Sequence, residues 1–383
     1  MDLLRYTLRV ARRIPLRYLL CLGAVALVAV AMVQFSLPAN TERVQAAAPV
    51  PTETTILGVG DILLGRQLGE DMAKTGDYTL AFRDIRETLA AADITFGNLE
   101  GPFCGKPPYP ASGMSFRFRP EAIASLMNAG FDVVSVANNH FGDGGDACMT
   151  FSVDLLRDSE VEPAGAGRTF EEAHQAVVVE RNGIGFAFLG YTFAARNDDP
   201  KSKRPVIAGR DAEQVRRDVV AARERADLVI VSLHDGAEYT ERVAPETEEF
   251  AHAAIDAGAV AVFGHHPHVP QRVERYKNGW IFYSLGNFVF QQNTPPATRR
   301  ALVARLTFSG GELVIVEAIP VVIEWFAQPR LASAEEGPAI LASVGLKDSL
   351  LWPAAAPAEK QPAGEAPPGE KSKPAGSASR WSF

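Results

Sequence analysis

Short apolar runs rich in β-branched residues recur along the middle of the chain, and longer segments with a helical repeat separate them. The runs predict buried strands at 55–59, 94–96, 133–136, 228–233 and 259–262. Between the runs, apolar residues at helical spacing predict helices around Phe82, Ile85 and Leu89, around Ile123, Leu126 and Met127, around Val215, Val219 and Ala222, and from Pro245 to Gly258. Strands that alternate with helices indicate an α/β or α+β sandwich.

Further strands are expected outside this alternation. The runs 177–179 and 186–189 flank an Asn-Gly dipeptide, which is typical of a hairpin turn. Two β-rich runs, 301–308 and 313–323, follow late in the chain. The sheet is therefore expected to contain more strands than the alternating part supplies.

The first part of the chain has a different pattern. Five arginines precede a stretch from Tyr18 to Thr41 that carries no charged residue. About 20 apolar residues span a bilayer, so this stretch predicts a transmembrane anchor whose basic flank stays in the cytoplasm. A cleaved signal peptide is the alternative. The rest of the protein is then expected to be membrane-anchored and to face the periplasm or cell exterior, or to be secreted after cleavage.

These patterns divide the chain into six segments. They are a basic cytoplasmic segment at 1–17, a transmembrane anchor or signal sequence at 18–39, a linker at 40–53, a folded domain at 54–326, a C-terminal extension at 327–353 and a tail at 354–383. The tail is rich in Ala, Pro, Gly, Glu and Lys, and we expect it to be disordered because it has too few large apolar residues to form a core.

Composition limits the classes of partner. Hydrophobic residues make up 47% and charged residues 22% of the chain, which is ordinary for a globular protein. The formal net charge is −8, and binding of nucleic acid phosphates needs a basic surface. We therefore expect no nucleic acid partner.

Two cysteines lie within the predicted domain, Cys104 and Cys148. In an exported protein such a pair can form a disulfide. Each cysteine follows a polar motif described below by a few residues, so their loops are expected to meet. Two independent free thiols are the alternative.

The histidines gather after predicted strands. Three of the seven lie in Gly264-His265-His266-Pro267-His268, and His140 and His234 also follow apolar runs. In open α/β sheets, ligands bind at the carboxyl ends of the strands. Imidazoles that converge there indicate a transition-metal site.

Oxygen ligands follow other predicted strands. They are Asp61, then Asn98 and Glu100, then Asn138 and Asn139. A single Gly-Asp after a strand is usually a turn or a helix cap, and an Asn-His pair can be a buried polar turn. Five strand ends that all present such residues favour a mixed nitrogen and oxygen site for Zn, Mn or Fe, with one ion or two.

Six segments in this order closely resemble the CapA family of poly-γ-glutamate capsule biosynthesis, which belongs to the calcineurin-like metallophosphoesterase superfamily. The segments are Gly60-Asp61-Ile62-Leu63-Leu64-Gly65-Arg66, Asn98-Leu99-Glu100-Gly101-Pro102, Ala137-Asn138-Asn139-His140, His234-Asp235-Gly236-Ala237-Glu238-Tyr239, Gly264-His265-His266-Pro267-His268 and Tyr283-Ser284-Leu285-Gly286-Asn287-Phe288. The resemblance covers roughly residues 55–290.

The resemblance implies a four-layer α/β/β/α sandwich that holds a divalent metal centre, with two ions of Mn, Fe or Zn. The ligand candidates that it implies are Asp61, Asn98, Glu100, Asn139, His234, His266 and His268. It gives His140 the catalytic role of assisting the leaving group. Arg66, Asn138 and His265 are candidates for contacts with an anionic substrate, although a structural ion pair is an equally good explanation for Arg66.

The sequence also departs from the resemblance. The superfamily begins its site with Asp-x-His, and here Leu63 occupies the third position of that motif, so one metal position is expected to be weaker or empty. His265 competes with His266 as the ligand, and we favour His266. The two remaining histidines, His174 and His252, are interpreted as surface or helix residues.

Three hypotheses for function follow. The first is an anchored CapA-like protein with hydrolase chemistry that acts in the synthesis, transport or attachment of poly-γ-glutamate or another capsule-type polymer, within a membrane polymer-synthesis complex. The second is an exported metal-dependent phosphoesterase unrelated to capsule. The third is a non-catalytic scaffold of a polymer-export complex. The expected substrate is an anionic polymer or a phosphoester.

Overall fold

The computed structural model describes residues 52–292, 294–324 and 327–352. The predicted anchor or signal sequence at 18–39 and the predicted tail at 354–383 lie outside the described residues. Within the described ranges, no helix combines the length and the apolar character needed to cross a bilayer.

The larger of two main sheets has nine strands. Their order is β16-β15-β14-β1-β2-β3-β4, with β13 beside β1 and β17 beside β15. The strands are β1 (Glu53–Ile62), β2 (Ile94–Leu99), β3 (Val133–Ser135), β4 (Glu162–Ala164), β13 (Asn287–Val289), β14 (Arg300–Ser309), β15 (Glu312–Glu324), β16 (Gln328–Leu331) and β17 (Leu350–Trp352). Strands β1 to β4 run parallel, so their carboxyl ends meet at one edge of the sheet.

The second sheet has six strands in the order β11-β12-β10-β9-β7-β6. The strands are β6 (Val177–Arg181), β7 (Ile184–Thr192), β9 (Leu228–His234), β10 (Ala261–His265), β11 (Val273–Tyr276) and β12 (Gly279–Phe282). Strands β7, β9, β10 and β12 are parallel. A small third sheet pairs β5 (Ala166–Gly167) with β8 (Val206–Ile207).

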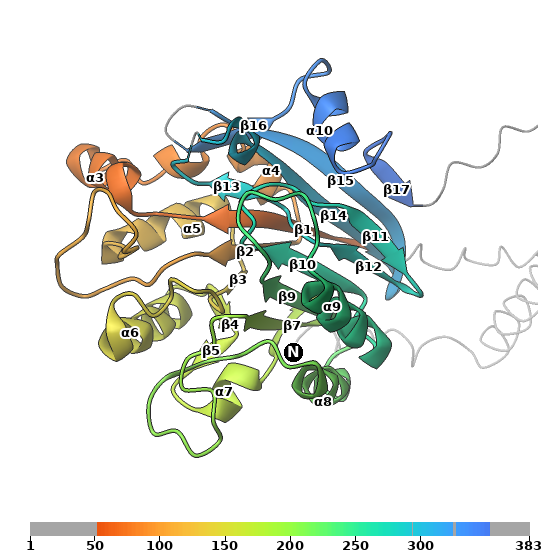
Figure 1. Cartoon of the computed structure of the whole chain (residues 1–383), viewed down its shortest axis with the longest axis horizontal. Helices are drawn as coiled ribbons and strands as arrows, with labels where there is room; N and C mark the ends of the chain where they lie inside the picture. Colours follow the sequence, from red (N-terminus) through yellow and green to blue (C-terminus); the bar gives the residue numbers. More distant parts are fainter. Residues whose placement is uncertain (1–51, 293, 325–326, 353–383) are drawn as a thin grey trace, which may run out of the picture. The chain divides into compact units, whose positions relative to one another are not determined.

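Helices pack on the outer faces of both sheets, and Figure 1 shows α8 and α9 beside the six-stranded sheet. The helices are α3 (Arg66–Thr75), α4 (Arg86–Ala90), α5 (Ile123–Ala129), α6 (Gly145–Asp158), α7 (Phe170–His174), α8 (Ala212–Arg223), α9 (Pro245–Ala257) and α10 (Gly337–Ser343), with the 3-10 turns η1 (Leu80–Phe82), η2 (Pro120–Ala122) and η3 (Pro296–Arg299). Helices α3 to α6 share an apolar core with the nine-stranded sheet, and α7 to α9 share another with the six-stranded sheet.

A third core lies between the two sheets. Phe96 of β2 and Phe188 of β7 stack there with ring centroids 5.5 Å apart, and Phe263 of β10 packs beside them. All three side chains are fully buried. The predicted mixed α/β fold with several sheets is confirmed, and this packing holds the ends of β1, β2, β9 and β10 close together.

Local predictions have mixed outcomes. The hairpin is confirmed by antiparallel pairing of β6 with β7, and α9 runs from Pro245 to a left-handed Gly258 as predicted. The prediction that Met127 lies on the buried face of its helix is wrong, because Met127 is 52% exposed. Helix α5 buries residues spaced by three, Ile123, Leu126 and Ala129, and this narrow stripe leaves Met127 outside it.

The described residues after 326 belong to the folded unit. Residues 327–352, which the sequence sets apart as an extension, contribute β16 and β17 to the nine-stranded sheet, and both strands pair with β15. Helix α10 lies between them in the chain and packs against the core between the sheets. The two strands have only four and three residues, which is too short for a sequence pattern to predict them.

Candidate metal centre

The register of the strands brings the predicted site residues together. Asp61 at the end of β1 lies opposite Asn98 of β2 on one side and Asn287 of β13 on the other. In the second sheet, His234 of β9 lies opposite His265 of β10. All five side chains are fully buried. Parallel pairing therefore aligns the polar residues that follow separate apolar runs.

Asp61 is the centre of this cluster. Its Oδ1 accepts a hydrogen bond of 2.8 Å from Asn98 Nδ2 and lies 3.5 Å from His265 Nδ1. Its Oδ2 accepts a hydrogen bond of 3.3 Å from the backbone N–H of His266 and lies 3.4 Å from His268 Nδ1. One carboxylate thus links the ends of β1, β2 and β10 and the turn that follows β10.

Two glycines allow the strand ends to approach this closely. A Cβ on Gly60 would lie 1.9 Å from the carbonyl oxygen of Gly286, and one on Gly264 would lie 2.0 Å from the carbonyl oxygen of Tyr283. The backbone N–H of Asp61 donates to that same Gly286 oxygen at 3.0 Å. Only a residue without a side chain fits at either position.

Hydrogen bonds among side-chain amides and one imidazole connect the end of β3 to this cluster. Asn138 Nδ2 donates to Asn98 Oδ1 at 3.1 Å and to the carbonyl oxygen of Leu99 at 2.8 Å. Asn139 Oδ1 lies 2.8 Å from His234 Nε2, whose other ring nitrogen lies 3.2 Å from Asn98 Nδ2. Asn138 is fully buried and braces the β2 and β3 loops, and Asn139 reaches across to the second sheet.

Several buried atoms of the cluster have no hydrogen-bond partner among the described residues. They are both carboxylate oxygens of Glu100, both ring nitrogens of His265 and Nδ1 of His266. Leaving such groups unpaired costs about 1–3 kcal/mol each, more for a charge. Carboxylate oxygens and imidazole nitrogens are ligands for Zn, Mn or Fe. The orphaned donor set therefore fits a divalent metal ion.

Among the described residues, three groupings of possible ligands are close enough to hold an ion. The grouping of Glu248, His252 and Glu274 lies on α9 and β11, and the other two belong to this site. In each grouping, one ligand atom per residue lies within 4.8 Å of the others. One consists of Asp61, Glu100 and His234, all fully buried, and the other consists of Glu238, His266 and His268. The two asparagines that were predicted as ligands, Asn98 and Asn139, each form a hydrogen bond with His234.

The pKa values of the two buried carboxyl groups, Asp61 and Glu100, shift in opposite directions. Burial raises the pKa of Asp61, yet the imidazoles of His265 and His268 more than offset this and hold it well below its ordinary value. Burial and the neighbouring Asp61 raise the pKa of Glu100 well above its ordinary value. Burial lowers the pKa of His234 and of His266, which favours the neutral imidazole that binds metals.

His140 lies at the edge of the cluster and is held on three sides. Its Nδ1 lies 2.9 Å from Asp143 Oδ2, and its Nε2 lies 4.0 Å from Glu100 Oε1. Its ring stacks on Phe116 with centroids 3.8 Å apart. Asp143 also accepts a hydrogen bond of 2.7 Å from the backbone N–H of Phe116. The imidazole is therefore oriented with Nε2 toward the ligand cluster.

Arg66 also lies over the phenyl ring of Phe116. Its guanidinium carbon is 4.5 Å from the centroid of Phe116, and Nε donates to the carbonyl oxygen of Gly113 at 2.9 Å. No carboxylate of the described residues pairs with it, so the structural ion pair considered from the sequence is not formed. Burial lowers its pKa. An incoming anion is a suitable partner for this half-buried cation, and substrate contact by Arg66, Asn138 or His265 stays a prediction.

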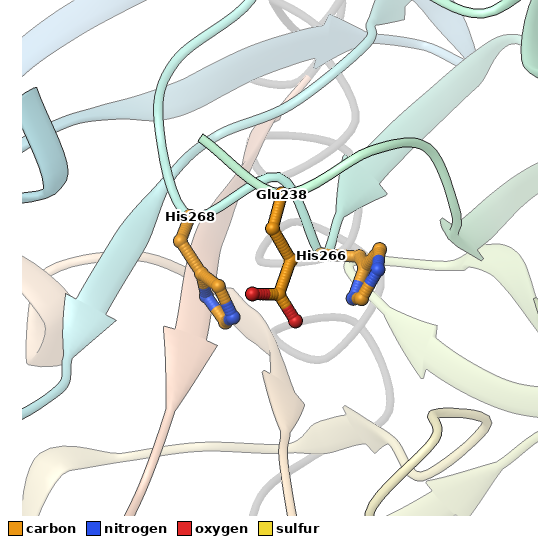
Figure 2. Close-up of side chains that lie close together, drawn as sticks. All are labelled: Glu238, His266 and His268. Carbon is orange, nitrogen blue, oxygen red and sulfur yellow. The ribbon is translucent and has the colours of Figure 1, made fainter. Parts of the chain in front are cut away.

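Three neighbours of the site were missed from the sequence as functional residues, although each lies in or beside a motif. Glu238 approaches His266 and His268 (Figure 2). Asn287 Oδ1 lies 2.9 Å from His268 Nδ1, and Asp143 pairs with His140. Their short distance in sequence from predicted site residues could have indicated two of them, since Glu238 follows His234 by four residues and Asp143 follows His140 by three.

Cys104 and Cys148 form a disulfide, which is one of the two alternatives that the sequence left open. It joins the loop after β2 to the first turns of α6, and a Cβ on Gly144 would lie 2.3 Å from Cys148 Sγ. The bridge thus lies directly beneath the turn that carries His140 and Asp143.

Comparisons with known proteins agree with this arrangement. The family described as bacterial capsule synthesis protein PGA_cap matches residues 55–292, which include every strand end of the site. The chain belongs to this family. It is 32% identical to the capsule biosynthesis protein CapA of Bacillus anthracis over 76% of this chain and 74% of that protein. It is 31% identical to the PGA biosynthesis protein CapA of Bacillus subtilis over 64% of this chain and 65% of that protein.

A solved structure of a hypothetical protein from Thermus thermophilus also aligns with the chain. It is 19% identical, covers 70% of this chain and 98% of that protein, and has a TM-score of 0.45. A score of this size does not define the fold, which here follows from the strand order. Family membership therefore rests on the sequence comparisons, which confirm the predicted resemblance.

Proposed function

We propose that this capsule synthesis family member is a metal-dependent hydrolase that cleaves a phosphoester during the synthesis, transport or attachment of poly-γ-glutamate or another anionic capsule-type polymer. The observation that carries the proposal is the set of buried, unpartnered ligand atoms on Glu100, His265 and His266. A purely structural cluster would satisfy these atoms with hydrogen bonds. The relatives supply the link to capsule.

The proposed chemistry follows from the positions of the side chains. When bound, divalent ions supply Lewis-acid stabilisation of the charge that develops on a phosphoryl group. The ester P–O bond breaks, the oxygen of a water molecule replaces the leaving oxygen on phosphorus, and His140 gives the leaving oxygen a proton. The proton that the attacking water loses returns to His140 through solvent. Asp143 holds Nδ1 of His140 at 2.9 Å, so Nε2 is the atom that delivers this proton.

The fold is consistent with this chemistry. The two stacked sheets with helices on both outer faces correspond to the four-layer α/β/β/α arrangement expected for a metallophosphoesterase, and we include that assignment in the proposal. The donor set of carboxylates, amides and imidazoles suits two ions of Mn, Fe or Zn.

We further propose that the domain works outside the cytoplasm. The disulfide between Cys104 and Cys148 supports this, because such bridges persist in oxidising compartments. The apolar segment at 18–39 is the proposed membrane anchor, with a cleaved signal peptide as the alternative. The proposed partners are the membrane, the anionic polymer or its phosphoester precursor, and a membrane polymer-synthesis complex.

The test combines metal analysis with catalysis on the full chain purified in detergent. We expect elemental mass spectrometry to find about one to two ions of Mn, Fe or Zn per chain, and hydrolysis of bis-p-nitrophenyl phosphate to depend on them. His266→Ala should lose metal and at least about 100-fold of the activity. His174→Gln is the matched control, because His174 lies on α7 and belongs to no ligand grouping.

Each alternative gives a different result. A wild-type protein that binds no metal under any loading condition, and a His266→Ala variant that restores polymer to a deletion strain, would together establish the scaffold. Metal-dependent hydrolysis in vitro with normal polymer in a strain carrying His266→Ala would establish a phosphoesterase unrelated to capsule.

A further inference from the structure

The loop between β9 and α9 is tied to the histidine turn by its backbone. The N–H of Tyr239 donates to the carbonyl oxygen of Pro267 at 2.8 Å, and the N–H of Asp235 donates to the carbonyl oxygen of His265 at 3.1 Å. Gly236 has φ of 118°, and Tyr239 has φ of 61°. These two residues bend the chain back over the turn, so the position of Glu238 between them is set by main-chain contacts.

From this position, the side chain of Glu238 reaches the imidazoles of His266 and His268. Figure 2 shows its carboxylate between the imidazoles of His266 and His268. One ligand atom from each residue lies within 4.8 Å of the others. His266 and His268 are each 5% exposed, whereas Glu238 is exposed. The carboxylate therefore closes the site from the solvent side.

The two histidines are already arranged for a ligand. Nδ1 of His266 is buried without a hydrogen-bond partner among the described residues. His266 and His268 have φ of 93° and 59°, values that cost a residue with a side chain about 1–3 kcal/mol. Such strain persists when the surroundings impose it, and here it directs both imidazoles toward one carboxylate (Figure 2).

The end of β1 supplies fewer ligand candidates than we expected from the sequence. The resemblance led us to expect an imidazole two residues after Asp61, and Leu63 stands there, 1% exposed within the apolar core. The end of β1 thus offers the site a single ligand. Glu238 comes from a different loop and supplies a charged donor on the side of His268.

We propose that Glu238 is a metal ligand that completes, with His266 and His268, an outer cation position distinct from the fully buried inner position of Asp61, Glu100 and His234. Two imidazoles and one carboxylate form a three-residue donor set that suits Zn²⁺ or Mn²⁺ and leaves coordination positions open. The outer ion is the more exposed and exchanges more readily. This inference rests on the proposed metal centre, but it concerns the number and placement of ions.

The test is a titration of the metal-stripped full chain with Zn²⁺ or Mn²⁺ alone, followed by calorimetry and by elemental analysis after dialysis. We expect two ions per wild-type chain with unequal affinities. Glu238→Gln should keep the tighter ion and weaken the other at least about 10-fold, because even indirect changes to a site cost this much. Glu100→Gln should weaken the tighter ion and leave the other bound.

Glu241→Gln is the matched control, because Glu241 is an exposed glutamate of the same loop that belongs to no ligand grouping. It should bind both ions as the wild type does. Two ions bound with unchanged affinities by Glu238→Gln, or a wild-type chain that binds a single ion, would overturn the outer position. Circular dichroism of the metal-free variants checks that each is folded.

The readout separates this inference from the proposed function. If the stoichiometry changes as expected but no phosphoester is hydrolysed, Glu238 is a ligand and the hydrolase proposal fails. If hydrolysis is metal-dependent and Glu238→Gln binds both ions normally, the hydrolase proposal stands and the outer position fails.

Discussion

Two buried clusters of histidine and carboxylate in this protein have opposite hydrogen-bonding states. At the candidate metal centre, Glu100 and His265 have no hydrogen-bond partner for their buried polar atoms among the described residues. In the second cluster, His174 lies between Asp198 and Asp218, with ring nitrogens 2.9 and 2.8 Å from their oxygens. Its imidazole is fully satisfied. Burial and charge are shared by both clusters, so the unsatisfied atoms are what indicate a ligand site.

The second cluster has the features of a structural clamp. Tyr191 and Gln214 donate to Asp218 at 2.7 Å each, and the backbone N–H of Gly209 donates to Asp198 at 2.8 Å. The cluster joins α7, α8, β7 and the loop that follows β7. The predictions below test whether the cluster with unsatisfied atoms serves catalysis and the cluster with satisfied hydrogen bonds serves stability.

The largest expected effect is on catalysis. His140→Asn should lower kcat for phosphoester hydrolysis by roughly 10²–10⁴-fold, because it removes the proton donor, while metal content stays unchanged. His174→Gln should leave kcat unchanged, because His174 belongs to the other cluster. Steady-state kinetics beside elemental analysis measure both. Equal losses of kcat in the two variants would break the distinction between the clusters.

A smaller effect is expected on the pH dependence of stability. Burial lowers the pKa of His174, but Asp198 and Asp218 more than offset this and raise it from the ordinary 6.5 to about 9. The stabilisation is therefore complete below pH 6.5 and is lost as pH rises through about 9. Urea unfolding of metal-free wild type should show a loss on the order of 2 kcal/mol over this window.

The matching variant isolates that contribution. His174→Gln should be less stable than the wild type at about pH 6 and should lose little further stability up to about pH 9. A variant that keeps the full wild-type pH dependence would assign the effect to other groups.

The smallest expected effect is on the free energy of unfolding, and its sign is opposite for the two clusters. Without metal, Glu100→Gln should raise the free energy of unfolding by about 1 kcal/mol, because a neutral amide avoids the cost of burying an ionisable carboxyl group that has no hydrogen-bond partner beside Asp61. Asp218→Asn should lower it by about 1–3 kcal/mol, because it disrupts satisfied hydrogen bonds. Urea unfolding in chelator measures both changes. Destabilisation by Glu100→Gln in metal-free protein would mean that Glu100 has a structural partner.

Much of the metal centre could be predicted because strand ends are encoded locally. An apolar run followed by Asp61, Asn98 or His234 gives both the strand and its polar end, and parallel pairing then brings these ends together. The family resemblance supplied the order of the segments. The sequence also offered the disulfide as one of two alternatives, because Cys104 and Cys148 both follow such ends, but it could not decide between the bridge and free thiols.

Other features depend on contacts that the local sequence does not encode. The placement of Glu238 follows from backbone hydrogen bonds to the turn at Pro267, and nothing near Glu238 predicts them. His174 was interpreted as a surface or helix residue. It ends helix α7 but is 6% exposed, because its partners Asp198 and Asp218 come from distant segments.

The close approach of Gly60 to Gly286 and of Gly264 to Tyr283 has a consequence for genetics. Neither glycine offers a functional group, yet any side chain there would meet a backbone oxygen at 1.9 or 2.0 Å. In a mutational screen, alleles at these codons would score as severely as alleles at Asp61. Protein abundance separates the two classes, since a glycine allele depletes the folded protein, whereas a ligand allele leaves it present but inactive.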